Sequence, residues 1–369
     1  MWPLLLMLAA GAVFHTRIER EMVDFNVYRT AAARALAAEP LYRADDQHYQ
    51  FKYLPAFALA MTPFAMVDPE AAKAIWFALS AGLLTAFIRW SVRALPERRR
   101  SERVLLWVTA LLMLKFYLHE LTLGQTNILL GALIMGALLA TQVEVPRVAG
   151  ILVGMAAFVK PYALLLLPWL AFSAGTTAAW ASAGVLGAGL VLPALVYGWN
   201  GNVQQLVDWW RTVTGTTPGN LLGADNVSLA AMWAKWIGLG APATALATIT
   251  TGGILGLVAT VWVRRQTVSS PEYLECALLM LLVPLLSPQG WDYVLLLGTP
   301  AVVFLVDRWK DVSQQWRLIT AVSLALMGLT VFDIMGRTLY AHFMALSIIS
   351  VAAIATAVAL THLRWQALG

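Results

Sequence analysis

Long apolar runs alternate with short polar segments along nearly the whole chain. The runs are continuous and rich in Ala, Leu and Val, and they lack the period-of-two alternation of strands in a membrane barrel. Only helices and closed barrels satisfy every backbone polar group in lipid, so the pattern predicts an all-α integral membrane protein. The predicted spans, about twelve in all, are 1–15, 71–93, 104–119, 126–142, 148–159, 161–173, 178–199, 241–263, 272–287, 291–306, 317–333 and 341–361.

Composition supports this interpretation. Of the 369 residues, 60% are hydrophobic and 12% are charged, against roughly 25% charged residues in globular chains. We therefore expect one transmembrane domain over residues 1–369, in contact with membrane lipids. The net charge of +5 indicates basic cytoplasmic loops, and we expect no nucleic-acid partner. A single cysteine, Cys276, excludes an internal disulfide.

Basic residues fall in alternate loops, which predicts the orientation. Placing all of them in the cytoplasm gives one consistent multi-pass topology in the cell membrane, with both chain ends inside. The large first loop, residues 16–70, and a later loop, residues 200–239, then face outward. The basic positions are 93, 98–100, 103, 264–265, 308, 310, 317 and 364.

Residues 54–67 are apolar but number only 14, whereas a span needs about 20 residues, or about 17 at the short end. We interpret this segment as a helix lying at or dipping into the membrane, because a crossing would put residues 98–100 outside. The first span is also short and lacks a basic flank. A cleaved signal peptide and a mis-assigned start codon are the alternatives for it.

The first loop holds the candidate base. Asp24 lies just beyond the expected membrane edge, before an Ala-rich amphipathic segment. One interpretation is an N-cap, which stabilises a helix by about 1 kcal/mol. The other is a carboxylate at the rim of a membrane cavity, where it acts as a general base. Composition alone slightly favours the interpretation of Asp24 as an N-cap.

A second polar group follows Gly124, which should end a helix. Gln125 and Asn127 start the next predicted span, where their amides either cap it or bind hydroxyl groups in a cavity. His119, a few residues earlier, is by itself more typical of an interfacial residue than of a ligand. These two interpretations of the amides carry equal weight.

Lys160 is the most informative single residue, because it interrupts an apolar stretch and Pro161 follows it. A charge at that depth costs about 2.5–3.5 kcal/mol on insertion scales unless it meets water or a counter-ion. A snorkelling lysine is the plain alternative. The broken helix favours a lysine that lines a cavity, where its ammonium group suits a phosphate.

Two further segments belong to the outer side. Asn226 precedes Ser228 at the start of a short helix, where an asparagine is most often a cap. Trp291 and Asp292 lie at an outer span junction and offer an aromatic wall and a second carboxylate. The acidic pair Asp45 and Asp46 is weak evidence for a cation, so no metal site is expected.

In this order the motifs resemble glycosyltransferase family 87, also called the DUF2029 membrane proteins. The resemblance covers most of the chain, from residue 24 to about residue 300. Its elements are Asp-Phe-x-Val-Tyr at 24–28, Pro-Leu-Tyr at 40–42, Tyr53 with Pro55, Gly-Gln-x-Asn at 124–127, Gly150 to Lys160-Pro161, Asn226-x-Ser228, and Ser287-Pro288 with Trp291.

The resemblance implies a GT-C type helical bundle with a large first periplasmic loop. It implies a polyprenyl-phosphate sugar as donor, with mannose the best-known sugar, and a lipid or glycan acceptor on the outer face. The acidic residue of the first motif is the expected base, which carries over to Asp24. The donor- or acceptor-binding residues implied are Tyr28, Lys52, Tyr53, Gln125, Asn127, Lys160, Asn226, Trp291 and Asp292.

The sequence departs from the family pattern at two places. Asp292 follows Trp291 where a histidine is common shortly after the Trp, which puts a histidine-assisted step in doubt. Leu54 precedes Pro55 where a second proline is common. No cofactor is expected, since a monophosphate leaving group lessens the need for a divalent metal. A transporter or flippase, and a non-catalytic envelope scaffold, are the competing interpretations; the chain shows no internal repeat that would favour transport.

Overall fold

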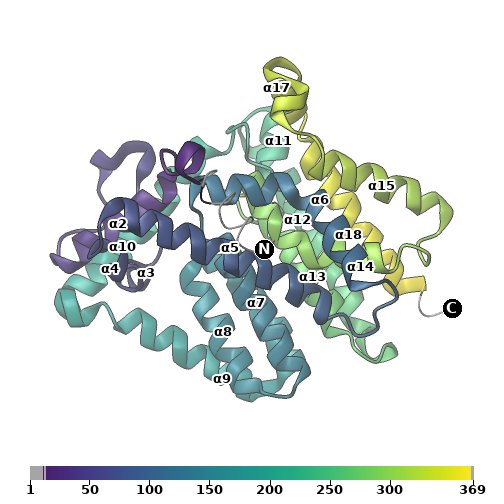
Figure 1. Cartoon of the computed structure of the whole chain (residues 1–369), viewed down its shortest axis with the longest axis horizontal. Helices are drawn as coiled ribbons and strands as arrows, with labels where there is room; N and C mark the ends of the chain where they lie inside the picture. The colour runs from purple at the N-terminus through teal and green to yellow at the C-terminus, as the bar shows by residue number, and fades with distance from the viewer. Residues whose placement is uncertain (1–10, 12–13, 367–369) are drawn as a thin grey trace.

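The computed structural model describes residues 11 and 14–366, and the described part is built from helices (Figure 1). The first half contains η1 (Phe14–Ile18), α2 (Val23–Leu36), η2 (Ala44–Tyr49), α3 (Pro55–Ala60), α4 (Thr62–Ala65), α5 (Pro69–Arg93), α6 (Glu102–Leu123), α7 (Asn127–Gln142), α8 (Pro146–Val159), η3 (Pro161–Leu166) and α9 (Leu167–Val191). The second half contains α10 (Ala194–Asn220), α11 (Leu229–Ile237), α12 (Ala241–Val263), η4 (Arg265–Thr267), α13 (Glu272–Leu286), η5 (Asp292–Gly298), α14 (Thr299–Asp307), α15 (Gln314–Gly328), α16 (Phe332–Met335), α17 (Arg337–Ala345) and α18 (Ile348–Gln366).

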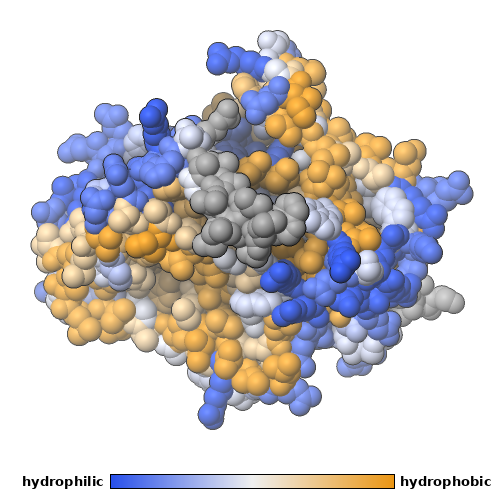
Figure 2. Space-filling model, in the orientation of Figure 1, coloured by the Kyte–Doolittle hydropathy of each residue, from blue (hydrophilic) through white to orange (hydrophobic). Residues whose placement is uncertain are grey.

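The prediction of an all-α membrane protein is confirmed at this level. Within the described residues, five helical segments are long and apolar enough to cross a membrane: Pro69–Arg93, Glu102–Leu123, Pro161–Val191, Ala241–Val263 and Ile348–Trp365. Hydrophobic residues cover much of the visible surface, while hydrophilic residues gather around α2 at the upper left and near α14 at the lower right (Figure 2). The total of about twelve spans stays a prediction. Most of the expected first span, 1–15, lies outside the described residues.

The apolar segment Pro161–Val191 folds back on itself at Gly175. Gly175, inside α9, has φ 78° and ψ −177°, which is not helical and is open to glycine. Gly150 near the start of α8 lies against Ala178, and Phe158 near its end lies against Gly189. The second half of α9 therefore runs parallel to α8, and the first half runs the opposite way. The reversal falls between the predicted segments 161–173 and 178–199.

The basic loops meet at one end of the bundle. They are joined there by hydrogen bonds between loops that are distant in the sequence, and a shared cavity is lined by Pro96, Thr267 and Arg364. The contacts are Arg99 N and Arg100 N to Asp307 Oδ1 at 2.9 Å, Arg308 Nη2 to Glu97 O at 3.0 Å, Arg265 Nη2 to Ser173 Oγ at 3.0 Å, and Arg364 Nη2 to Pro271 O at 3.0 Å. The charge pattern predicts that these loops lie on one side of the membrane. Their contacts at one end of the bundle are consistent with that prediction.

The segments expected outside meet at the opposite end. In Figure 1, α2, α3, α4 and α10 lie together at the left. Gln205 Oε1 of α10 accepts a hydrogen bond from Leu41 N at 3.1 Å, and Trp209 Nε1 donates to Lys52 O at 3.1 Å. Residues 54–67 form two short helices, α3 and α4, and not the single helix expected, because Pro55 and Pro63 each start a new helical turn. The loop expected at 200–239 is largely helical, since α10 continues to Asn220.

The arrangement of the two ends predicts the outcome of cysteine labelling in intact cells. In a Cys276→Ala background, Ala224→Cys should react with an impermeant maleimide from outside, and Arg98→Cys should react only after the cells are opened. Both positions are exposed, whereas Cys276 is buried. Labelling of Arg98→Cys from outside would reverse the orientation that the basic loops predict.

Candidate functional site

The turn at Gly124 brings the first loop onto the bundle. Gly124 ends α6 in the left-handed conformation, with φ 68° and ψ 34°. A Cβ at this position would lie 2.8 Å from Phe25 Cβ of α2. Trp76 Nε1 of α5 donates a hydrogen bond to Gly124 O at 2.9 Å. This close approach brings α2 beside Gln125, the next residue of the turn.

Gln125 joins side chains from four other parts of the chain. Its Oε1 accepts hydrogen bonds from Tyr28 OH at 3.0 Å, Tyr53 OH at 3.2 Å and Lys160 Nζ at 3.3 Å. Its Nε2 donates to Tyr293 OH at 3.2 Å. The hydroxyl groups of Tyr28 and Tyr53 are 2.7 Å apart. The amide is therefore the centre of the site, and its role as a helix cap is wrong, since Thr126 precedes α7 without any side-chain cap.

Asp24 belongs to the same network. It is the second residue of α2, and Met22 occupies the N-cap position, so the interpretation of Asp24 as an N-cap is wrong. Burial raises the pKa of the Asp24 carboxyl; the hydrogen bond from Gln125 and the positive charge of Lys160 oppose the rise. The raised pKa makes the Asp24 carboxylate a stronger proton acceptor than a fully solvated aspartate.

Two lysines approach the carboxylate from different segments. Lys160 has an extended backbone, φ −151° and ψ 124°, where α8 ends and the tighter η3 begins. Its Nζ lies 5.6 Å from the ring centre of Tyr53 and 5.8 Å from that of Tyr162. The side chain is turned into the site, so the snorkelling interpretation is wrong. Lys52 Nζ lies 3.5 Å from Gln289 Oε1, and burial lowers the pKa of its ammonium group while Asp24 opposes the change.

Glu120 is a buried carboxylate at the site that the sequence pattern did not single out. It is fully buried, and its carboxylate accepts hydrogen bonds from Asn127 Nδ2 at 2.8 Å and Ile128 N at 3.0 Å. Asn127 Oδ1 in turn accepts from Tyr162 OH at 2.8 Å. Glu120 therefore accepts the hydrogen bond of a free backbone N–H group at the start of α7. The neighbouring amide side chains were expected to have this capping role. The available signal was a carboxylate near the end of a long apolar segment.

Asp292 pairs with the histidine that was interpreted as interfacial. His119 Nδ1 and Asp292 Oδ1 are 3.3 Å apart, with 37% and 3% of their side chains exposed. The His119 ring stands edge-on to Tyr293, with 5.0 Å between ring centres. Tyr293 connects this pair to Gln125. A histidine is thus present in the site, supplied by α6 and not by the segment after Trp291.

Asn226 and Trp291 hold loops together and are not part of the Gln125 network. Asn226 Nδ2 donates to Asn220 O at 3.0 Å and Pro288 O at 2.9 Å, and its backbone pairs with that of Trp291. Ser228 Oγ accepts from Ala231 N at 3.1 Å, so Ser228 caps α11 and the cap interpretation of Asn226 is wrong. Their contacts hold the loop that carries Asp292 against the start of α11.

One member of the acidic pair in the first loop, Asp46, is bound to Arg34, and the other, Asp45, is exposed. Both carboxylate oxygens of Asp46 bond to Arg34, at 2.5 and 2.7 Å. Across the described part of the chain, no three His, Cys, Asp or Glu side chains gather as metal ligands would. The site therefore offers the carboxylates of Asp24, Glu120 and Asp292, two ammonium groups, a histidine and several hydroxyl groups for chemistry.

Comparison with known families agrees with this chemistry. Residues 51–288 match glycosyltransferase family 87. The chain belongs to that family. It is a membrane glycosyltransferase, with a sugar donor and an acceptor as its substrates. No curated protein matches the chain. The matched region includes Lys52, Gln125 and Lys160, and it begins after Asp24 and ends before Asp292.

The contact at Gly124 predicts a stability change. Gly124→Ala forces Cβ against Phe25 and adds the cost of a left-handed residue, about 1–2 kcal/mol. We expect a lower Tm in detergent together with loss of transferase activity, because α2 carries Asp24. Gly184→Ala in α9 is the control, since nothing lies within 4 Å of its Cβ position. Equal Tm values for the two variants would contradict the close packing of α2.

Proposed function

We propose that this glycosyltransferase transfers a hexose, mannose in the first instance, from a polyprenyl-phosphate donor to a lipid or glycan acceptor on the outer face of the cell membrane, with inversion. The observation that carries the proposal is the position of Asp24 beside Gln125 and Lys160, at the end of the bundle opposite the basic loops. A donor whose lipid chain stays in the bilayer presents its phosphate and sugar at this level.

Asp24 is the proposed base. Its carboxylate takes the proton of the acceptor hydroxyl as that oxygen attacks the anomeric carbon, and the bond from that carbon to the phosphate oxygen breaks. The electron pair leaves with polyprenyl phosphate. The raised pKa of Asp24 supports this role, because a base works best when its pKa approaches the working pH. Gln125 orients the carboxylate through its amide.

Lys160 and Lys52 are proposed to stabilise the leaving phosphate. Both side chains lie close enough to Asp24 for electrostatic interaction with its carboxylate. An ammonium group is a compact charge that binds a phosphate without fixed geometry. Phosphate that carries a developing negative charge is stabilised most where water is excluded. The half-buried environment of both lysines supports this role.

The first test replaces Asp24 by Asn. Asn keeps the size and polarity of the side chain but accepts no proton, so we expect turnover to fall by about 10²–10⁴-fold while donor binding and Tm change little. The assay uses purified protein with radiolabelled polyprenyl-phosphate hexoses and a membrane-lipid extract. Asp45→Asn is the matched control, since Asp45 is an exposed carboxylate of η2. Near-normal turnover of Asp24→Asn would remove Asp24 from the mechanism.

The second test uses Lys160. Lys160→Met should weaken donor binding and lower turnover, and Lys160→Arg should keep part of both. The base must be ionised, so kcat/KM falls as the pH drops through the pKa of Asp24, which lies above the usual value of about 3.9. Removing the lysine charge raises that pKa further, so the acid limb of Lys160→Met should move to higher pH. Unchanged donor affinity in Lys160→Met would exclude contact with the phosphate.

A further inference from the structure

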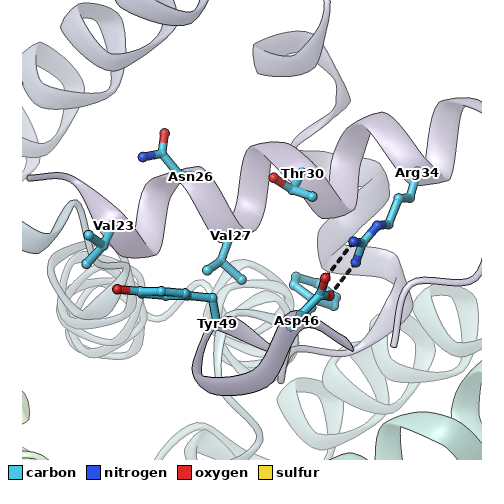
Figure 3. Close-up of a pocket in the computed structure, with 8 residues that line it drawn as sticks. Val23, Asn26, Val27, Thr30, Arg34, Asp46 and Tyr49 are labelled. Atoms are coloured by element: carbon cyan, nitrogen blue, oxygen red, sulfur yellow. Dashed lines mark hydrogen bonds and ion pairs between the residues drawn. The ribbon is translucent and has the colours of Figure 1, made fainter. Parts of the chain in front are cut away.

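A groove of about 360 Å³ lies between α2 and η2 (Figure 3). No role described above uses it. Asn26, Thr30 and Arg34 lie along one face of α2, since they are spaced by four residues. Asp46 and Tyr49 line the groove from η2, with Arg34 turned toward Asp46 (Figure 3), and we call this space the α2–η2 groove. Its volume is at the lower end of the roughly 300–1,000 Å³ of small-molecule sites.

The charged side chains of the groove neutralise each other. Arg34 and Asp46 form a two-fold hydrogen-bonded pair, with N–O distances of 2.5 and 2.7 Å, and they are the only charged residues among those that line the groove. An anionic headgroup would need a cation free of such a partner. The groove therefore suits a neutral ligand, to which the pair offers fixed donors and acceptors.

The remaining lining alternates apolar and polar surface. Tyr49 is 55% exposed and lies beneath Val27 (Figure 3). The buried ring of Phe51 also borders the groove. Asn26 and Thr30 are exposed and present an amide and a hydroxyl group. Aromatic and aliphatic surface beside amide and hydroxyl groups matches a sugar ring, which has C–H faces and a hydroxyl edge.

One end of the groove lies near the proposed base, although Asp24 itself is not among the lining residues. Val23, which precedes Asp24, lines the groove. The ring of His48 lies 5.3 Å from that of Tyr49, and His48 is near enough to Asp24 for its charge to act on the carboxylate. Lys52 follows Phe51 directly, so a single segment borders both the groove and the site. A chain of sugar rings in the groove would bring its terminal hydroxyl toward Asp24.

We propose that the α2–η2 groove is the acceptor subsite of this transferase and that it binds a neutral, hydroxyl-rich saccharide. The inference rests on the proposed function, because it takes Asp24 as the group that receives the acceptor proton. On this proposal the first loop recognises the sugar part of the acceptor and not a charged lipid headgroup.

Saccharide binding is tested on the purified full chain without any donor. The probes are neutral di- to tetrasaccharides of mannose, glucose and galactose, observed by saturation-transfer NMR. Asn26→Ala and Tyr49→Ala should each weaken binding about tenfold, equivalent to about 1.4 kcal/mol, and Tyr49→Phe should retain most of it. Asn200→Ala is the control for Asn26→Ala, since Asn200 is an exposed asparagine outside the groove.

The outcomes separate the groove from the reaction. Absence of binding by every saccharide, or binding that the groove variants leave unchanged, would overturn the proposal. Binding of phosphatidylglycerol vesicles that the same variants abolish would assign the groove to an anionic lipid and would also overturn it. Saccharide binding without transfer from polyprenyl-phosphate hexoses would leave the groove standing and exclude the proposed donor. Transfer from polyprenyl-phosphate hexoses without saccharide binding in the groove would support the proposed donor and overturn the groove as the acceptor subsite.

Discussion

Helix α2 packs so closely against the turn at Gly124 that a hydrogen atom is all that fits where other residues carry Cβ. This contact depends on the left-handed backbone of Gly124, and Trp76 donates a hydrogen bond to the carbonyl of the same residue. Because α2 docks there, Asp24 and Tyr28 meet Gln125. The proposed base is thus fixed to the membrane bundle by one turn between α6 and α7, although it comes from a loop.

Charges in the site are stabilised by neutral polar groups as much as by each other. Glu120 is held by Asn127 and a backbone amide, and Lys160 by Gln125 and two aromatic rings. An unpaired charge in such surroundings is costly, so each needs these partners whether or not substrate is bound. The broken backbone at Lys160 is what allows the ammonium group to turn inward.

The two ends of the bundle have different roles. At one end, arginines and carboxylates from distant loops bond to one another and tie the helices together. At the other, the first loop and Tyr293 meet at Gln125, α10 bonds to the first loop, and the α2–η2 groove lies within that loop. All the chemistry proposed for the transferase therefore lies at a single end, which suits a donor that is anchored in the bilayer.

The sequence by itself determined the class of fold, the helix break at Lys160 and the family, because apolar length, proline and motif order are local properties of the chain. It also picked out Asp24, Gln125 and Lys160, since polar groups stand out against an apolar background. Only the tertiary structure decided their partners. Whether Asp24 caps a helix, whether Lys160 points outward, and whether Glu120 or His119 belongs to the site all depend on which distant segments pack together. Those contacts are set by side-chain shape and hydrogen-bond geometry across the bundle, which leave little trace in the local pattern.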